Sequence, residues 1–240
     1  PAAAEDCGTA REIAVAEAYR VPVHICHVST RTSMNIIRDA KKRGVAVTAE
    51  TCPHYFMMTH EELKKRDADY RMNPPLRTED DRQAMIEGLL DGTLDAIATD
   101  HAPHLLNEKE GGALKAMSGM PMIQFSLVSM LELVDKGVFS LETVVQKMCH
   151  APARIYGICH RGYIREGYQA DLVLVRPNSP WEVSADKILS KCGWSPLEGH
   201  TFNWKVEKTF ANGHLIYNGN TVDDSYRGEE LRFDYPSAGA

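Results

Sequence analysis

The first 104 residues of the chain repeat one pattern, in which a short apolar segment suited to a buried β-strand precedes an amphipathic helix. Thr30 predicts the start of one helix that ends near Gly44, and acidic residues after Thr78 predict a second helix that ends at Gly92. Strands that alternate with helices predict a parallel sheet in an α/β fold. The three predicted strand segments are 21–28, 45–51 and 94–100.

Side chains that can bind a metal or transfer a proton follow each of these three segments. His27 lies at the end of the first, Glu50 and His54 lie at and just beyond the end of the second, and Asp100 and His104 follow the third. The carboxyl ends of parallel strands meet on one face, where ligands of β/α proteins bind. Three successive strands that end in this way predict a functional site.

Each of these residues also has a structural interpretation. His27 taken alone is more often a hydrogen-bonded core histidine than a ligand. Asp100 needs a partner to offset its desolvation, and a helix cap or a salt bridge could serve as well as a metal. The loop at 70–81 is either a proline-rich turn or a stiff loop that holds Asn73 and Arg77 towards the strand ends as substrate contacts.

Four segments carry a resemblance to a known family. The motifs "HICHVST" at 24–30, "MNPPLR" at 72–77 and "DAIATDHAPH" at 95–104 resemble those of dihydroorotases of the amidohydrolase superfamily, in the longer bacterial-type class. The motif "ETCPHY" at 50–55 is similar to allantoinases and hydantoinases as well, so it marks only the wider group. The resemblance runs from near residue 5 to about residue 217.

The resemblance implies a fold, an activity and a set of roles. Residues 1–157 would form the C-terminal portion of a (β/α)8 amidohydrolase barrel with packing helices, and 158–240 a small β module with a tail. The activity would be the reversible, zinc-dependent interconversion of N-carbamoyl-L-aspartate and L-dihydroorotate in pyrimidine biosynthesis, at a binuclear site. His27 would be a metal ligand after the sixth barrel strand, and Asp100 a metal ligand and the catalytic residue after the eighth. The residues that would contact the substrate are Asn73, His104, Ser118 and Gly119.

These residue types suit the chemistry. Hydrolysis of an unactivated cyclic amide near neutral pH needs a strong nucleophile, and zinc provides one by lowering the pKa of bound water to about 7. An aspartate such as Asp100 can take up a proton and return it to the leaving nitrogen. A second hypothesis is an allantoinase or hydantoinase, and a third is an inactive dihydroorotase-like fragment or assembly subunit.

The departures from the family are as informative as the matches. The family has a His-x-His pair after the first strand, a bridging carboxylated lysine or aspartate after the fourth, and a further histidine after the fifth, and none of these is in the sequence. A whole barrel takes about 250 residues. We therefore expect the chain to be the C-terminal part of a dihydroorotase, unable to form the binuclear site alone.

The remainder of the chain has a different sequence pattern. Apolar residues at helical spacing predict packing helices at 119–137 and 140–157. Short strands are expected at 170–175 and on both sides of the hairpin signal Asn212-Gly213, in a module that strands from the N-terminal part of the protein would extend. The tryptophans expected in the core of this β module are Trp181, Trp194 and Trp204.

Composition limits the partners and the compartment. The formal net charge of -6 and the absence of a Lys/Arg block longer than the "KKR" at 41–43 argue against nucleic acid or an anionic membrane as partner. The expected partner is a small molecule, and a homodimer is one assembly that the resemblance allows. The six cysteines form no CxxC pair, which favours buried or inert thiols in the cytoplasm. No apolar run approaches membrane-spanning length, and the start "PAAAEDCG" suggests a chain cut at its N-terminus.

Overall fold

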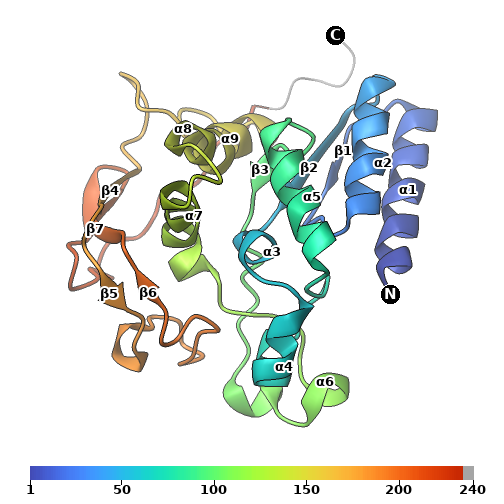
Figure 1. Ribbon diagram of the computed structural model, residues 1–240. Coiled ribbons are helices and arrows are strands. Elements are labelled where there is room, and N and C mark those ends of the chain that lie inside the picture. Colours follow the sequence, from blue (N-terminus) through green and yellow to red (C-terminus); the bar gives the residue numbers. More distant parts are fainter. Residues whose placement is uncertain (235–240) are drawn as a thin grey trace. The chain divides into compact units, whose positions relative to one another are not determined.

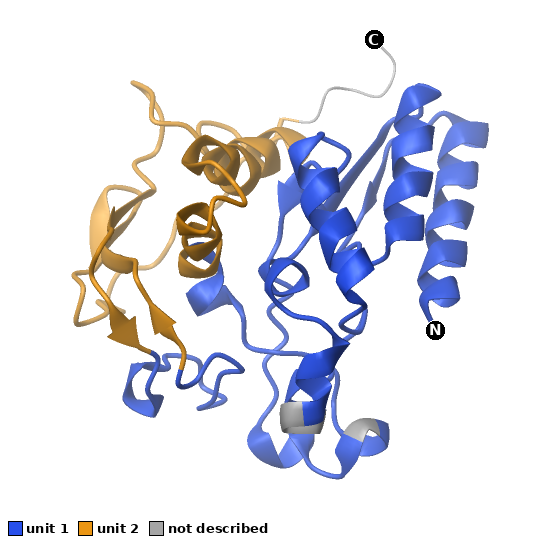
Figure 2. Ribbon diagram, in the orientation of Figure 1, with its two compact units in different colours: residues 1–127, 183–199 blue, residues 128–182, 200–240 orange. Residues whose placement is uncertain are grey.

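The computed structural model describes residues 1–234, apart from the side chains of residues 65–67 and 113. The chain divides into two units that interleave in sequence (Figure 2). Unit 1 consists of Pro1–Leu127 and Val183–Gly199, and unit 2 takes the remainder. The division predicted near residue 157 stays a prediction. Trp194, which was expected in the β module, instead belongs to unit 1.

Unit 1 contains a parallel sheet of three strands, as the alternation of strands and helices predicted (Figure 1). Its strands are β1 (Val23–Ile25), β2 (Val47–Thr51) and β3 (Ala96–Ile97), in the order β1-β2-β3. Each predicted apolar segment therefore contains a strand, although β1 and β3 are much shorter than the segments predicted at 21–28 and 94–100. The parallel register brings the carboxyl ends of the three strands to one edge.

Helices of unit 1 begin where the sequence places their caps. The Thr30 side chain accepts a hydrogen bond from Ser33 N, and Thr78 forms a capping box with Asp81. Helix α1 was not predicted from the sequence. The helices that begin in unit 1 are α1 (Ala2–Tyr19), α2 (Arg31–Lys42), α3 (Pro53–Met57), α4 (Leu63–Arg66), α5 (Glu79–Leu90), α6 (Gly112–Lys115) and α7 (Ser126–Asp135). Short 3-10 turns cover His60–Glu62, Asp67–Tyr70, Leu106–Lys109, Ile123–Phe125 and Ala185–Lys187.

One face of the parallel sheet is buried and the other is polar. In β2, Val47, Ala49 and Thr51 are buried, while the alternate residues Thr48 and Glu50 are half-buried. The apolar face of α2 is fully buried, and Figure 1 shows α1, α2 and α5 side by side along the sheet. The helices thus bury one face and leave the polar side chains of the other free to form a site.

Unit 2 combines short helices with antiparallel strands. The segment predicted as a helix at 140–157 forms α8 (Leu141–Val145), a π-helical turn (Gln146–His150) and α9 (Ala151–Ile155). One sheet has the order β4-β7-β8, and a second pairs β5 with β6. The predicted hairpin at Asn212-Gly213 is confirmed, because their φ angles of 51° and 84° are those that a type I′ turn requires. The strands are β4 (Leu172–Arg176), β5 (Trp181–Glu182), β6 (Thr201–Phe202), β7 (Lys205–Ala211) and β8 (His214–Tyr217).

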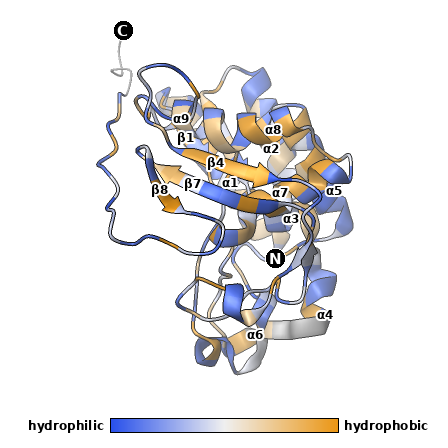
Figure 3. Cartoon of the chain, turned by 90° about the vertical axis from the view of Figure 1, so that its left-hand side faces the viewer, coloured by the Kyte–Doolittle hydropathy of each residue, from blue (hydrophilic) through white to orange (hydrophobic). Residues whose placement is uncertain are grey.

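Strand β4 is apolar along most of its length and yet open to solvent (Figure 3). Val173 is 46% exposed and its neighbour Leu174 is 45% exposed. Burying the exposed half of each of these side chains would contribute about 1 kcal/mol. That further strands of the whole protein extend this sheet remains a prediction.

Candidate functional site

The loop after β1 presents His27 in an unusual backbone conformation. His27 has a φ of 40°, in the left-handed region that non-glycine residues seldom adopt. Its Nδ1 atom is buried and has no hydrogen-bond partner among the described residues. A buried ring nitrogen without a partner is costly unless a ligand or ion receives it, so this atom fits a metal ligand.

Helix α1 fixes the residues that follow His27. The Glu5 carboxylate accepts hydrogen bonds from Ser29 N at 2.8 Å, from Ser29 Oγ at 2.5 Å and from Thr30 N at 3.2 Å. Arg77 donates to Glu5 at 3.0 Å and to Ser29 Oγ at 3.1 Å. Arg77 was a candidate substrate contact in the sequence, but in the structure it holds this loop through Glu5 and Ser29.

Asp100 follows β3 and, like His27, has a left-handed backbone conformation. Its φ is 44°, and its side chain is half-buried. Burial raises the pKa of the Asp100 carboxyl group, with Glu50 acting in the same direction and His27 opposing it. The charges of His27 and Glu50 therefore act on Asp100, and the ends of all three strands contribute to one electrostatic environment.

His54, at the start of α3, is completely buried beside this group. Neither of its ring nitrogens has a hydrogen-bond partner among the described residues, and its ring lies edge-on to Tyr55. Burial, and then His27, lower the pKa of His54 to about 3, so its ring is neutral near pH 7. The sequence grouped His54 with the site, and the structure brings it close enough to His27 for the two rings to interact electrostatically.

Further candidate ligands lie on the polar face of the sheet. His24, Cys26 and Glu50 each offer a ligand atom, and the three atoms lie within 4.8 Å of one another. His24 Nε2 is 3.2 Å from Glu50 Oε2, and its Nδ1 is 2.8 Å from Thr48 Oγ1. Neither His24 nor Cys26 was among the candidate ligands predicted from the sequence. The overlooked signal is strand alternation, which puts residues 24 and 26 on one face.

The six cysteines differ in their exposure to solvent. All six are free thiols, but Cys7, Cys26 and Cys149 are exposed, and only Cys52 is buried. Burial raises the pKa of both the Cys26 and the Cys52 thiols, with Glu50 and Asp100 adding to each shift. Three of the cysteines are therefore exposed rather than buried, and that these thiols are inert stays a prediction.

The predicted substrate contacts lie on three further loops, which carry Asn73, His104 and Ser118-Gly119. Asn73 is exposed, and the Tyr55 hydroxyl fixes its loop by donating to Pro74 O at 2.6 Å. His104 Nε2 lies 3.1 Å from Ser118 O, which joins two of the predicted contacts directly.

Gly119, the last predicted contact, packs tightly against the His104 loop. It has a φ of 145°, and a Cβ there would lie 2.5 Å from Ala102 O, so only glycine fits. Gly119 N also donates to Arg71 O at 2.9 Å, two residues before Asn73. The structure thus links the backbone segments of all four predicted substrate contacts.

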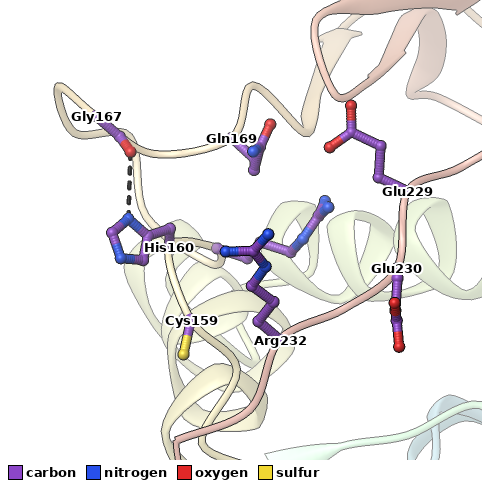
Figure 4. A pocket seen from close by; sticks show the side chains of 8 residues that line it. Cys159, His160, Gly167, Gln169, Glu229, Glu230 and Arg232 are labelled. Atoms are coloured by element: carbon purple, nitrogen blue, oxygen red, sulfur yellow. Dashed lines mark hydrogen bonds between the residues drawn. The ribbon is translucent and has the colours of Figure 1, made fainter.

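A pocket of about 600 Å³ lies in unit 2, away from these loops in the sequence (Figure 4). His160 Nδ1 lies 3.3 Å from Gly167 O at its rim. None of the predicted site residues lines it. The lining residues are Cys159, His160, Arg161, Gly167, Gln169, Glu229, Glu230 and Arg232.

Comparison with known proteins defines the class of this chain. The model of the Amidohydrolase family matches residues 4–216, and the chain belongs to this family. Members of the family generally use a metal, which agrees with the unpartnered ring nitrogens described above.

The curated relatives show which members of this family the chain resembles. The chain is 46% identical over 217 residues to the dihydroorotase of Geobacter metallireducens, covering 90% of this chain and 51% of that protein. It is 44% identical to the dihydroorotase of Acetivibrio thermocellus, with the same coverage of each. The chain spans about half the length of the curated relatives it matches.

Solved structures give the same fold. L-hydantoinase from Arthrobacter aurescens superposes with a TM-score of 0.88 at 26% identity, covering 92% of this chain and 50% of that one. Dihydropyrimidinase from Brevibacillus agri gives a TM-score of 0.84, also at 26% identity, with the same coverage. The predicted fold class, a portion of an amidohydrolase barrel, is confirmed. Within the described part of the chain, no helix has the length and hydropathy needed to cross a membrane.

Proposed function

We propose that the protein to which this chain belongs is a zinc-dependent dihydroorotase that interconverts N-carbamoyl-L-aspartate and L-dihydroorotate. The observation that carries the proposal is that His27 and Asp100 both adopt a left-handed conformation just after the end of a parallel strand. The identity of 42–46% to dihydroorotases supports the choice of substrate. By the same resemblance we place the protein in the cytoplasm.

In this proposal the chain supplies part of a binuclear metal site. His27 would hold a metal through its imidazole and Asp100 through its carboxylate, while the other ligands would come from the rest of the protein. Zinc, when bound, would act as a Lewis acid on the amide carbonyl and lower the pKa of water. Whether His24, Cys26 and Glu50 also bind a metal can be tested by substituting each in turn and measuring metal content.

Asp100 is the proton carrier in this scheme. Its carboxylate would take a proton from the attacking water and return it to the ring nitrogen as the amide bond breaks. In the biosynthetic direction it would assist ring closure with loss of water. Its half-buried position just after β3, at the edge where the carboxyl ends of the parallel strands meet, supports this role.

Three loops would bind the substrate. Asn73 and His104 would donate to its carbonyl or carboxylate oxygens, and the backbone of Ser118 and Gly119 would contact the ring. The bond between the His104 and Ser118 segments supports a shared role, because a fixed pair of loops orients a small ligand better than two independent ones.

A hydantoinase or dihydropyrimidinase is the second candidate, favoured by the names of the structural neighbours. The higher identity to dihydroorotases argues against it. Assays of the whole protein with dihydroorotate, hydantoin and allantoin distinguish these possibilities. No turnover of any of the three would favour the third candidate, an inactive homologue.

The catalytic assignment is tested by Asp100→Ala in the whole protein. We expect turnover to be lost in both directions while the circular dichroism spectrum stays unchanged. Activity within tenfold of the parent at matched metal content would refute the role of Asp100.

A further inference from the structure

Lys109 is a buried lysine whose bonds all lead to the backbone of predicted substrate loops. It ends the 3-10 turn Leu106–Lys109 and is only 3% exposed. Lysine is almost never buried to this extent unless its charge is received by other groups. Burial lowers the pKa of Lys109 to about 8, while Asp69 acts against this shift, so the side chain remains an ammonium group at neutral pH.

Three carbonyl oxygens receive this ammonium group. Lys109 Nζ lies 2.9 Å from Arg71 O, 2.8 Å from Met117 O and 2.9 Å from Gly119 O. An ammonium group has three donors, so these bonds satisfy it fully. We call the Nζ atom with these three carbonyl groups the carbonyl clamp.

The carbonyl clamp joins segments that are far apart in the sequence. Arg71 lies two residues before Asn73, and Met117 and Gly119 flank Ser118. Two neighbouring bonds reinforce it, because Gly119 N donates to Arg71 O at 2.9 Å and the Arg71 guanidinium donates to Ala116 O. One side chain therefore holds the two loops on which three of the predicted substrate contacts lie.

Trp194 lies beside the carbonyl clamp and connects it to His104, the fourth predicted substrate contact. The ring of Trp194 is buried, and its centroid lies 5.8 Å from Lys109 Nζ. Its Nε1 atom donates to His104 O at 2.7 Å. The His104 loop is thus fixed by the same group of side chains.

We propose that Lys109 is a positioning residue that sets the substrate-binding geometry of the loops carrying Asn73 and Ser118-Gly119. This inference rests on the proposed function. Lys109 does not touch the substrate itself. Interactions made equally with substrate and transition state affect KM and leave kcat unchanged, so loss of the clamp should appear mainly in KM.

The test compares Lys109→Met with Lys115→Met in the whole protein. Lys115 is an exposed lysine at the end of α6, six residues further along the chain, so its substitution controls for the loss of a charge. We expect Lys109→Met to raise KM for dihydroorotate about tenfold or more, with kcat within about threefold of the parent and metal content unchanged. Lys115→Met should leave both constants unchanged. A KM within about twofold of the parent in folded Lys109→Met protein would overturn the proposal.

Hydrogen exchange provides a readout that does not depend on activity. Peptides covering residues 116–120 should exchange faster in Lys109→Met, because the carbonyl clamp no longer restrains the segment, and unchanged exchange would overturn the inference. Lys109→Gln serves as a second variant, and failure of both variants to fold would assign Lys109 to stability alone. If the parent protein does not turn over dihydroorotate, the proposed function fails, while the exchange experiment still decides the role of Lys109.

Discussion

Replacing Arg77 by methionine tests whether this residue supports the loop of His27. The side chains of Arg77 and Glu5 are only 12% and 13% exposed. Removing one partner of a buried ion pair usually costs about 3–5 kcal/mol. Ser29 and Thr30 would still donate to the Glu5 carboxylate, so we take the lower end and expect the free energy of unfolding to fall by about 3 kcal/mol.

The matched control is Arg43→Met. Arg43 pairs with Glu17 at 3.1 Å, but their side chains are 50% and 45% exposed. An exposed pair contributes about 0.2–1 kcal/mol, so this variant should be close to the parent.

Urea unfolding of the whole protein, followed by circular dichroism, measures both variants. With a slope of about 3 kcal/mol per molar urea, Arg77→Met should lower the midpoint of the affected transition by about 1 M and Arg43→Met by much less. Equal effects of the two variants, or a change below about 1 kcal/mol for Arg77→Met, would refute the argument that burial makes this pair important.

Two further predictions concern the site. Asn73→Ala and His104→Ala should each lower kcat/KM for dihydroorotate without loss of metal, because both residues are assigned to the substrate; loss of zinc in either variant, seen by elemental analysis, would contradict this division of roles. The 240-residue chain alone should bind less than one zinc per chain and show no dihydroorotase activity, because His27 and Asp100 are too few ligands for a stable site. Robust turnover by this polypeptide, after its mass has been verified, would show that the missing ligands are not needed.

The sequence predicted those parts of the fold that depend on local pattern. The three parallel strands, the caps at Thr30 and Thr78 and the hairpin at Asn212-Gly213 all follow from short-range signals. Helix α1 was missed although its buried residues Thr9, Ile13 and Ala16 have helical spacing, since alanine-rich composition makes this apolar stripe faint.

The functional site includes contacts that the sequence pattern does not predict. Positions after strands predicted His27 and Asp100, because parallel topology alone brings such residues to one edge. The contacts of Lys109 could not be predicted in this way, since its partners are backbone carbonyls, one of them 38 residues away, and carbonyl groups leave no trace in the sequence. Arg77 was only a candidate substrate contact, and the sequence did not indicate its ion pair with Glu5 because the two residues lie 72 positions apart.

The interleaving of the two units affects how the chain can fold during synthesis. Trp194 lies in the second segment of unit 1, Val183–Gly199, and reaches the His104 loop only after residues 128–182 have been made. The first segment of unit 1 leaves the ribosome with its three strands but without this indole, so the Lys109 side chain stays partly uncovered until the later segment arrives. Translation must therefore pass residue 199 before unit 1 can close, and a polypeptide that stops at residue 127 would expose this side to chaperones and proteases.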